Sequence, residues 1–253
     1  MKIRLFVLFS ILCMERGIAQ IDITESKVSA WIIAPNYSIQ FPLGNMKTDY
    51  GWNNNVGINA WRKTEQNWVF GFEGNFLFGS TVNNPYALGY AISSAGTVIG
   101  KEGSPIEFNL NERGWMLKAQ LGKVFKVFPK SNPNSGVLVM GGIGYLEHKT
   151  YIDIDDLNAR QFQSDYLTGY DRKTGGILLS GFLGYFYMSN NKFLHLYAGV
   201  EPNLGLTKNL RNWDFAENRK IVDARKDFLL GIKFAIMIAI FNKTKKKDVY
   251  YYQ

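Results

Sequence analysis

WVFGFEGNFLFG, residues 68–79, alternates bulky aromatic side chains with small or polar ones. The aromatic residues recur at every second position, which is the period of a β-strand, because successive side chains of a strand point to opposite faces. Glu73 lies on the other face, between Gly71 and Asn75, at the centre of the most apolar segment of the chain. A carboxylate there needs water or a charged partner, so the solvent on each face decides the fold.

The same alternation occurs in seven further segments, which predict seven more strands. They lie near residues 31–41, 55–60, 115–122, 137–145, 177–187, 194–206 and 228–240. Short connections rich in Asn, Pro and Lys join some of them, at 64–67, 128–135 and 189–192. Long polar stretches lie between the others, at 79–113, 147–174 and 207–226, and the 42–54 connection is intermediate. Tight turns that alternate with long loops are typical of an up-and-down transmembrane β-barrel.

The two faces of these segments differ in bulk, and this difference predicts their orientation. The apolar face is large and aromatic, whereas the opposite face carries Gly, Ala, Ser and Asn, which suit the narrow, filled interior of a barrel of about eight strands. We therefore expect the bulky face to contact lipid. Aromatic residues at strand ends then fall at the headgroup level: Trp68, Trp115, Tyr145, Tyr185 and Tyr187. A soluble, lipocalin-like carrier with the bulky faces turned inward is the alternative.

Four ionisable residues fall on the predicted inner face: Glu73, Lys118, Glu201 and Lys233. Two carboxylates and two ammonium groups on different strands can neutralise one another. Removing one partner of a buried pair leaves the other charge stranded, at a cost of about 3–5 kcal/mol. We interpret these four residues as structural charges that fill the lumen, not as catalytic groups.

The ends of the chain predict an exported protein. Lys2, Arg4 and the short apolar run 5–14 resemble a secretory signal, and small residues at 17–19 favour cleavage before Gln20. The sequence thus divides into a signal peptide, 1–19, and a single barrel domain, 20–253, with a short basic tail around 243–247. The formal net charge is +8 for the full chain, but the basic residues are scattered and an exported protein is a poor partner for nucleic acid.

With these features in place, the chain resembles small outer-membrane barrels of the OmpA-transmembrane, OmpX or OmpW type from Gram-negative bacteria. GGIGYLEHK (141–149) and TGYDRKTGG (168–176) also resemble stretches of Bacteroidetes-type barrel proteins. The spacing of Gly231, Phe234 and Ile236 is similar to the final-strand signal read by the barrel assembly machinery, although Leu229 stands where a polar residue is usual. The resemblance implies an outer-membrane location with both termini periplasmic, and contact with outer-membrane lipids, lipopolysaccharide and other envelope proteins.

Few residues suggest chemistry, and we predict no catalytic residue, cofactor or metal. His148 lies near the predicted rim with acidic neighbours but without a Ser on its face, which favours a hydrogen-bonded strand-end histidine over a hydrolase. Asp153, Asp155 and Asp156 lack the glycine and the terminal glutamate of a calcium loop. Aromatic and basic residues of the last long loop either bind a partner or pack the loop on itself: Arg211, Trp213, Phe215, Arg219 and Arg225.

The sequence therefore predicts a non-enzymatic integral outer-membrane protein with a structural or surface-interaction role through its long loops. An accessory subunit of an outer-membrane or secretion complex fits the same pattern. Two alternatives stay open: a narrow channel for small solutes, and a membrane-embedded lipid-modifying enzyme or hydrolase centred on His148.

Overall fold

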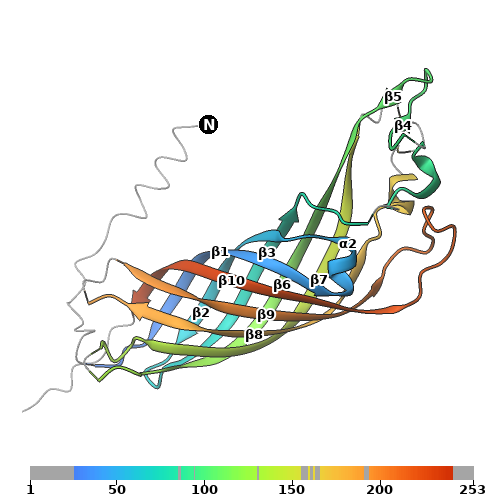
Figure 1. The fold of residues 1–253 in the computed structure, drawn as a ribbon. Coiled ribbons are helices and arrows are strands. Elements are labelled where there is room, and N and C mark those ends of the chain that lie inside the picture. The colour runs from blue at the N-terminus through green and yellow to red at the C-terminus, as the bar shows by residue number, and fades with distance from the viewer. Residues whose placement is uncertain are drawn as a thin grey trace, which may run out of the picture.

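A computed structural model describes residues 26–241, except 85–86, 94, 130, 155–158, 160–161, 163–165 and 191–193. The predicted signal peptide, the basic tail, Asp155 and Asp156 lie outside the described residues. Within them, eight antiparallel strands form a closed barrel in the order β1-β10-β9-β8-β7-β6-β3-β2 (Figure 1). The first strand pairs with the last, from Ala30 opposite Phe241 to Gly44 opposite Asp227. The predicted up-and-down, eight-strand fold is confirmed.

The barrel strands differ in length, and two of the longest, β6 and β7, extend beyond the barrel at the end that carries the long loops (Figure 1). Their bounds are β1 (Ala30–Gly44), β2 (Asn53–Lys63), β3 (Trp68–Gly79), β6 (Phe108–Phe125), β7 (Gly136–Ile154), β8 (Thr174–Met188), β9 (His195–Asn209) and β10 (Ala224–Phe241). The long loops hold the remaining elements: α2 (Asn45–Asp49), η1 (Gly89–Ala91), the strand pair β4 (Val98–Ile99) and β5 (Pro105–Ile106), and η3 (Tyr166–Gly169).

The turn at 64–67 shows how the short connections close. Asn67 adopts a left-handed conformation with φ of 64°, which Asn tolerates better than most residues. Its backbone N–H donates to the Thr64 carbonyl at 3.0 Å, and the Thr64 N–H donates to the Trp68 carbonyl at 2.8 Å. Next to this turn, Gly71 lets β2 approach, since a Cβ there would lie 2.1 Å from the Ala60 carbonyl oxygen.

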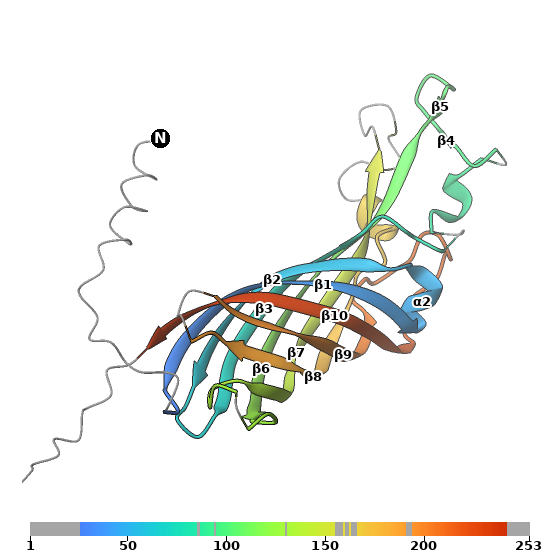
Figure 2. The same cartoon turned by 60° about the vertical axis from the view of Figure 1, so that its left-hand side comes forward.

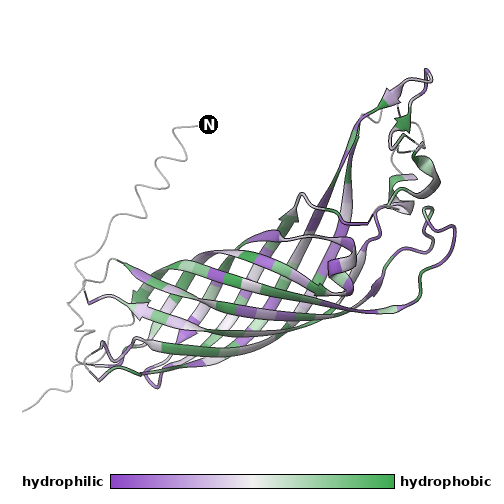
Figure 3. Ribbon diagram, viewed as in Figure 1, coloured by the Kyte–Doolittle hydropathy of each residue, from purple (hydrophilic) through white to green (hydrophobic). Residues whose placement is uncertain are grey.

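The opening segment, β3, has the predicted orientation. Phe72 is 64% exposed on the outside, whereas the adjacent Glu73 is 1% exposed inside the barrel. Figure 3 shows the same alternation of apolar and polar residues around the barrel. In a soluble lipocalin-like carrier the bulky residues would be buried, so that alternative is wrong. An apolar exterior suits a bilayer, and the closed sheet satisfies the backbone hydrogen bonds that hydrocarbon cannot.

Aromatic residues line both rims of the apolar exterior. At the short-turn end the Lys123 amine lies 5.0 Å from the Trp68 ring centroid, and the Arg62 guanidinium lies 5.1 Å from that of Trp31. At the long-loop end Trp115 packs on Tyr145 with ring centroids 5.4 Å apart. Aromatic rings and long basic side chains of this kind suit the boundary between hydrocarbon and headgroups.

Side chains fill the lumen in layers. The layer nearer the short turns contains large apolar residues: Trp61, Met140, Phe182, Phe186, Met188, Tyr197 and Met237. The layer nearer the long loops contains Met46, Tyr50, Leu77, Met116, Leu146, Leu178 and Leu229. The four predicted lumen charges lie between these layers, so hydrocarbon side chains separate them from both mouths.

A short helix covers the long-loop mouth, where the sequence predicts only a connection. α2 packs against the ends of β1 and β10 (Figure 2). Its Met46 is fully buried in the apolar layer nearer the long loops, which we call the upper apolar layer. Tyr50, which follows the helix, reaches across the barrel to Thr150, with the two hydroxyl oxygens 2.9 Å apart. Five residues are too few for a predictable helical period, so the alternation of apolar residues did not reveal it.

Candidate functional site

The structure places all four predicted lumen charges in one cluster, supplied by β3, β6, β9 and β10. Lys118 Nζ lies 3.0 Å from Glu73 Oε1 and 2.8 Å from Glu201 Oε1. Lys233 Nζ also contacts Glu73 Oε1, and it lies 2.5 Å from Glu201 Oε1. Each lysine therefore bridges both glutamates, and each glutamate bridges both lysines. This neutral, alternating ring, which we call the lumen tetrad, is at most 1% exposed.

Neighbouring polar groups satisfy the second oxygen of each tetrad carboxylate. The Asn59 amide donates to Glu73 Oε2 at 2.9 Å, and the Asn203 amide donates to Glu201 Oε2 at 3.1 Å. Tyr197 fixes Asn59 in turn, because its hydroxyl donates to Asn59 Oδ1 at 3.0 Å. Buried ion pairs persist only when such hydrogen bonds complete them. These partners are not among the predicted lumen charges, although Asn59, Tyr197 and Asn203 all fall on the predicted inner face.

His148 lies above the upper apolar layer and is 1% exposed. Its Nε2 lies 3.0 Å from Asp227 Oδ2, and the Thr207 hydroxyl donates to the same oxygen at 2.5 Å. Tyr50 packs edge-on against the His148 ring, with centroids 5.5 Å apart. His148 is thus hydrogen-bonded at a strand end, as expected, but its carboxylate partner lies 79 residues away and not among its acidic neighbours in sequence.

The hydrogen bond made by His148 within the described part of the chain goes to Asp227, and not to a Ser or a Cys. A histidine activates a nucleophile only when it lies within hydrogen-bond reach of it. The geometry therefore supports positioning of the strand ends by this pair and gives no support to a hydrolase centred on His148.

Arg225 connects this pair to the helix over the mouth. Its Nη2 lies 3.1 Å from Asp227 Oδ1 and 2.7 Å from Asp49 Oδ2 at the end of α2. One guanidinium thus links a lumen carboxylate to the helix that covers the lumen. Two ion pairs on a planar, always-charged group give a rigid connection.

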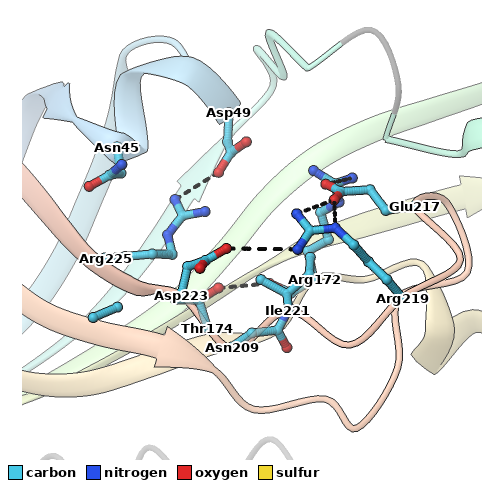
Figure 4. Close-up of a pocket in the computed structure, with 11 residues that line it drawn as sticks. Asn45, Asp49, Arg172, Thr174, Asn209, Glu217, Arg219, Ile221, Asp223 and Arg225 are labelled. Atoms are coloured by element: carbon cyan, nitrogen blue, oxygen red, sulfur yellow. Dashed lines mark hydrogen bonds and ion pairs between the residues drawn. The ribbon is translucent and has the colours of Figure 1, made fainter.

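A cavity of about 240 Å³ opens beside Arg225 at the long-loop mouth (Figure 4). Its walls carry three arginines and three carboxylates: Arg172, Arg219, Arg225, Asp49, Glu217 and Asp223. Ion pairs at 3.1 Å and 2.6 Å join Glu217 to Arg172 and Arg219. Arg172 holds its position with a left-handed backbone, φ 45°. The opposite charges of the walls are paired with each other, so this cavity is a structured junction of α2, the start of β8 and the last loop.

The aromatic and basic residues of the last long loop mostly pack the loop on its neighbours. Phe215 contacts Tyr170 edge-on at 5.5 Å, and a Cβ at Gly169 would lie 2.1 Å from its ring. Arg211 forms an ion pair with Asp171. The hydrogen bonds that its guanidinium donates to the Asp171 carboxylate raise the pKa of Arg211 above its ordinary value. Trp213 is the exception to this packing, since 46% of it stays exposed.

The described residues contain no group of three or more His, Cys, Asp or Glu side chains suited to a metal ion. Asp153 is exposed near the end of β7. The other two carboxylates of this run, Asp155 and Asp156, lie outside the described residues. In the part of the chain that the structure covers, no helix has the length and hydropathy needed to cross a membrane.

No protein-family model and no curated protein matches the sequence. Among solved structures, the chain is similar to Ail, the attachment invasion locus protein of Yersinia pestis, with 8% identity, a TM-score of 0.41 and coverage of 83% of this chain and 99% of Ail. A structure of Ail with the heparin analogue sucrose octasulfate gives 9% identity, a TM-score of 0.40 and coverage of 83% and 99%. The outer membrane protein OprG of Pseudomonas aeruginosa gives 14% identity, a TM-score of 0.37 and coverage of 85% of this chain and 99% of OprG.

With TM-scores this low, the similar structures support no conclusion about the role of this chain. The evidence for the closed barrel is the pairing of its own strands. The likeness to Bacteroidetes-type barrels stays a prediction.

Proposed function

We propose that the chain is a non-enzymatic integral outer-membrane protein that presents a structured loop surface outside the cell, with both termini in the periplasm. The observation that carries this proposal is the contrast between the two compartments of the molecule. The lumen is filled by the neutral tetrad and two apolar layers. The long-loop end holds an ion-paired junction, a helix and the protruding start of β6 and end of β7 (Figure 1).

The filled lumen favours this role over a narrow channel. A solute would have to displace buried side chains such as Trp61 and Phe186, which are at most 2% exposed. Planar-bilayer recording of the purified protein tests the difference: we expect no stepwise current. Steady, stepwise current openings would contradict our proposal and would show that the protein is a channel.

The placement of the loops has its own test. Cys13 is the single cysteine of the sequence, so a Cys13→Ser chain accepts one reporter at a time. Trp213→Cys lies in the exposed part of the last loop, and Glu65→Cys lies in an exposed short turn. A membrane-impermeant maleimide on intact cells should label position 213 and should label position 65 only after the outer membrane is permeabilised. Labelling of position 65 but not of position 213 on intact cells would show that the long loops face the periplasm.

A further inference from the structure

A basic collar lies on the outside of the barrel, above the apolar belt at the long-loop end. The outward column of each of five consecutive strands carries a basic residue at this height, on the strand or, for Lys173, directly before it: Arg113, Lys149, Lys173, Lys208 and Lys226. The outward columns of β1, β2 and β3 end instead in Leu43, Asn54 and Phe78. The collar therefore covers one side of the barrel, from β6 to β10.

Part of the collar is neutralised by the protein itself. Lys173 lies 2.8 Å from Glu147, and Lys149 lies 3.6 Å from Asp171. Lys208 and Lys226, on the neighbouring strands β9 and β10, make no ion pair with any described residue. Lys220, in the loop that joins these two strands, makes none within the same set either. Arg113 on β6 also has no ion pair in the described residues, and its guanidinium lies 5.7 Å from the Tyr151 ring centroid. The other unpaired cations, Lys208, Lys226 and Lys220, lie together beside the β9–β10 loop.

A cavity of about 410 Å³ lies at this position. Its walls combine the amines of Lys208 and Lys220 with the Asn212 amide and with two exposed apolar residues, Leu210 and Val222. Arg211 also lines it but is paired with Asp171. In contrast to the mouth cavity, no carboxylate lines these walls. The cavity therefore combines unpaired cations with apolar surface.

We propose that this cavity binds the phosphorylated headgroup of a lipid in the outer leaflet. Lys208 directly follows the lipid-facing column of β9, whose Leu206 is 46% exposed, so a lipid beside the barrel brings its headgroup to this height. Lysine amines suit phosphate oxygens. Leu206 offers apolar surface to the acyl chains below, whereas Leu210 and Val222 line the headgroup cavity itself. The orientation relative to the leaflet rests on the proposed function, but the binding chemistry does not.

The test is a titration of the purified full-length protein in neutral detergent with fluorescent diphosphoryl lipid A, compared with the same lipid after removal of its phosphates. The variant Lys208→Gln/Lys220→Gln removes both free amines. The matched control, Lys101→Gln/Lys126→Gln, removes two exposed lysines at the loop tip and at the opposite end of the barrel. Heat-modified gel mobility verifies that each variant is folded.

Two lysines that each contribute about 1 kcal/mol to an anionic headgroup predict roughly thirty-fold weaker binding in the first variant. The control should stay within about twofold of the wild type, and high salt should reduce the difference. Equal weakening in both variants would show non-specific attraction and overturn the site. Equal binding of the dephosphorylated lipid would overturn the role of phosphate.

A further arm separates the source of the phosphate. Inorganic phosphate in large excess should displace diphosphoryl lipid A poorly, because it lacks the acyl contacts. Full displacement at comparable concentrations would show that the cavity is a free-anion site and would overturn the lipid proposal. Surface labelling at position 213 reports separately on the orientation, so failure of one proposal does not imply failure of the other.

Discussion

Replacement of single and paired members of the lumen tetrad tests its alternating geometry. Glu73→Gln removes a negative charge and leaves Lys118 and Lys233 to share Glu201, so the lumen carries an excess positive charge. Loss of one partner of a buried ion pair costs about 3–5 kcal/mol. We expect the same loss of unfolding free energy for each of the four single variants, with Gln replacing Glu and Met replacing Lys.

The double variants distinguish the ring from two independent pairs. Each lysine contacts both glutamates, so removal of any one Glu together with any one Lys leaves a neutral pair in contact. We expect each of the four Glu–Lys doubles to lose about as much as one single variant, 3–5 kcal/mol and not the sum. Glu73→Gln/Glu201→Gln leaves two buried ammonium groups without a carboxylate, and its loss should reach or exceed the sum.

Denaturant-induced unfolding of the protein in lipid vesicles, followed by Trp fluorescence, measures these free energies. Lys226→Gln, an exposed residue without an ion pair in the described chain, is the control for loss of one charge and should change stability by less than about 0.5 kcal/mol. Additive losses in the Glu–Lys doubles would refute the ring. The ring would also be refuted if Glu73→Gln/Glu201→Gln lost no more unfolding free energy than a Glu–Lys double variant.

Three further changes probe other parts of the structure. Phe72→Arg places a charge in the middle of the lipid-facing column of β3 and should destabilise the vesicle-bound protein by about 2–4 kcal/mol, whereas Glu65→Arg in the exposed turn should not. Arg225→Met removes the link between α2 and the lumen carboxylate, so amide hydrogen exchange at 45–50 should accelerate at least about tenfold while the barrel strands keep their protection. Gly71→Ala forces a Cβ against the backbone of β2 and should lower the folded fraction on a heat-modifiability gel, whereas Gly74→Ala, which meets nothing closer than 4.0 Å, should fold normally.

The sequence predicts the face of every barrel strand, because a period of two is a local property that each segment shows alone. It also predicts the inward position of the four tetrad residues, which follows from the same alternation. It did not single out three further buried charges on the barrel strands: Lys63, Glu112 and Asp227. The pairing among the tetrad residues does not follow. Which atoms meet across a barrel depends on strand tilt and on the stagger of the whole closed sheet, and this is why Asp227, not a sequence neighbour, contacts His148. The ion-paired loops and α2 were unpredictable for a related reason: they have no period and are fixed by contacts between distant segments.

The layered lumen also explains why the tetrad requires four residues. The apolar layers on both sides exclude water from the charges, and in such surroundings an unpaired ion is far more costly than in water. In a single Glu–Lys pair the amine would contact one carboxylate, whereas each amine of the ring contacts two. Loss of one neutral pair should therefore weaken the barrel without opening it, because Trp61, Phe182 and Phe186 still fill the layer below. We expect Glu73→Gln/Lys118→Met to stay silent in planar-bilayer recordings; stepwise currents from this variant, absent in the wild type, would show that the charges and not the apolar layers close the lumen.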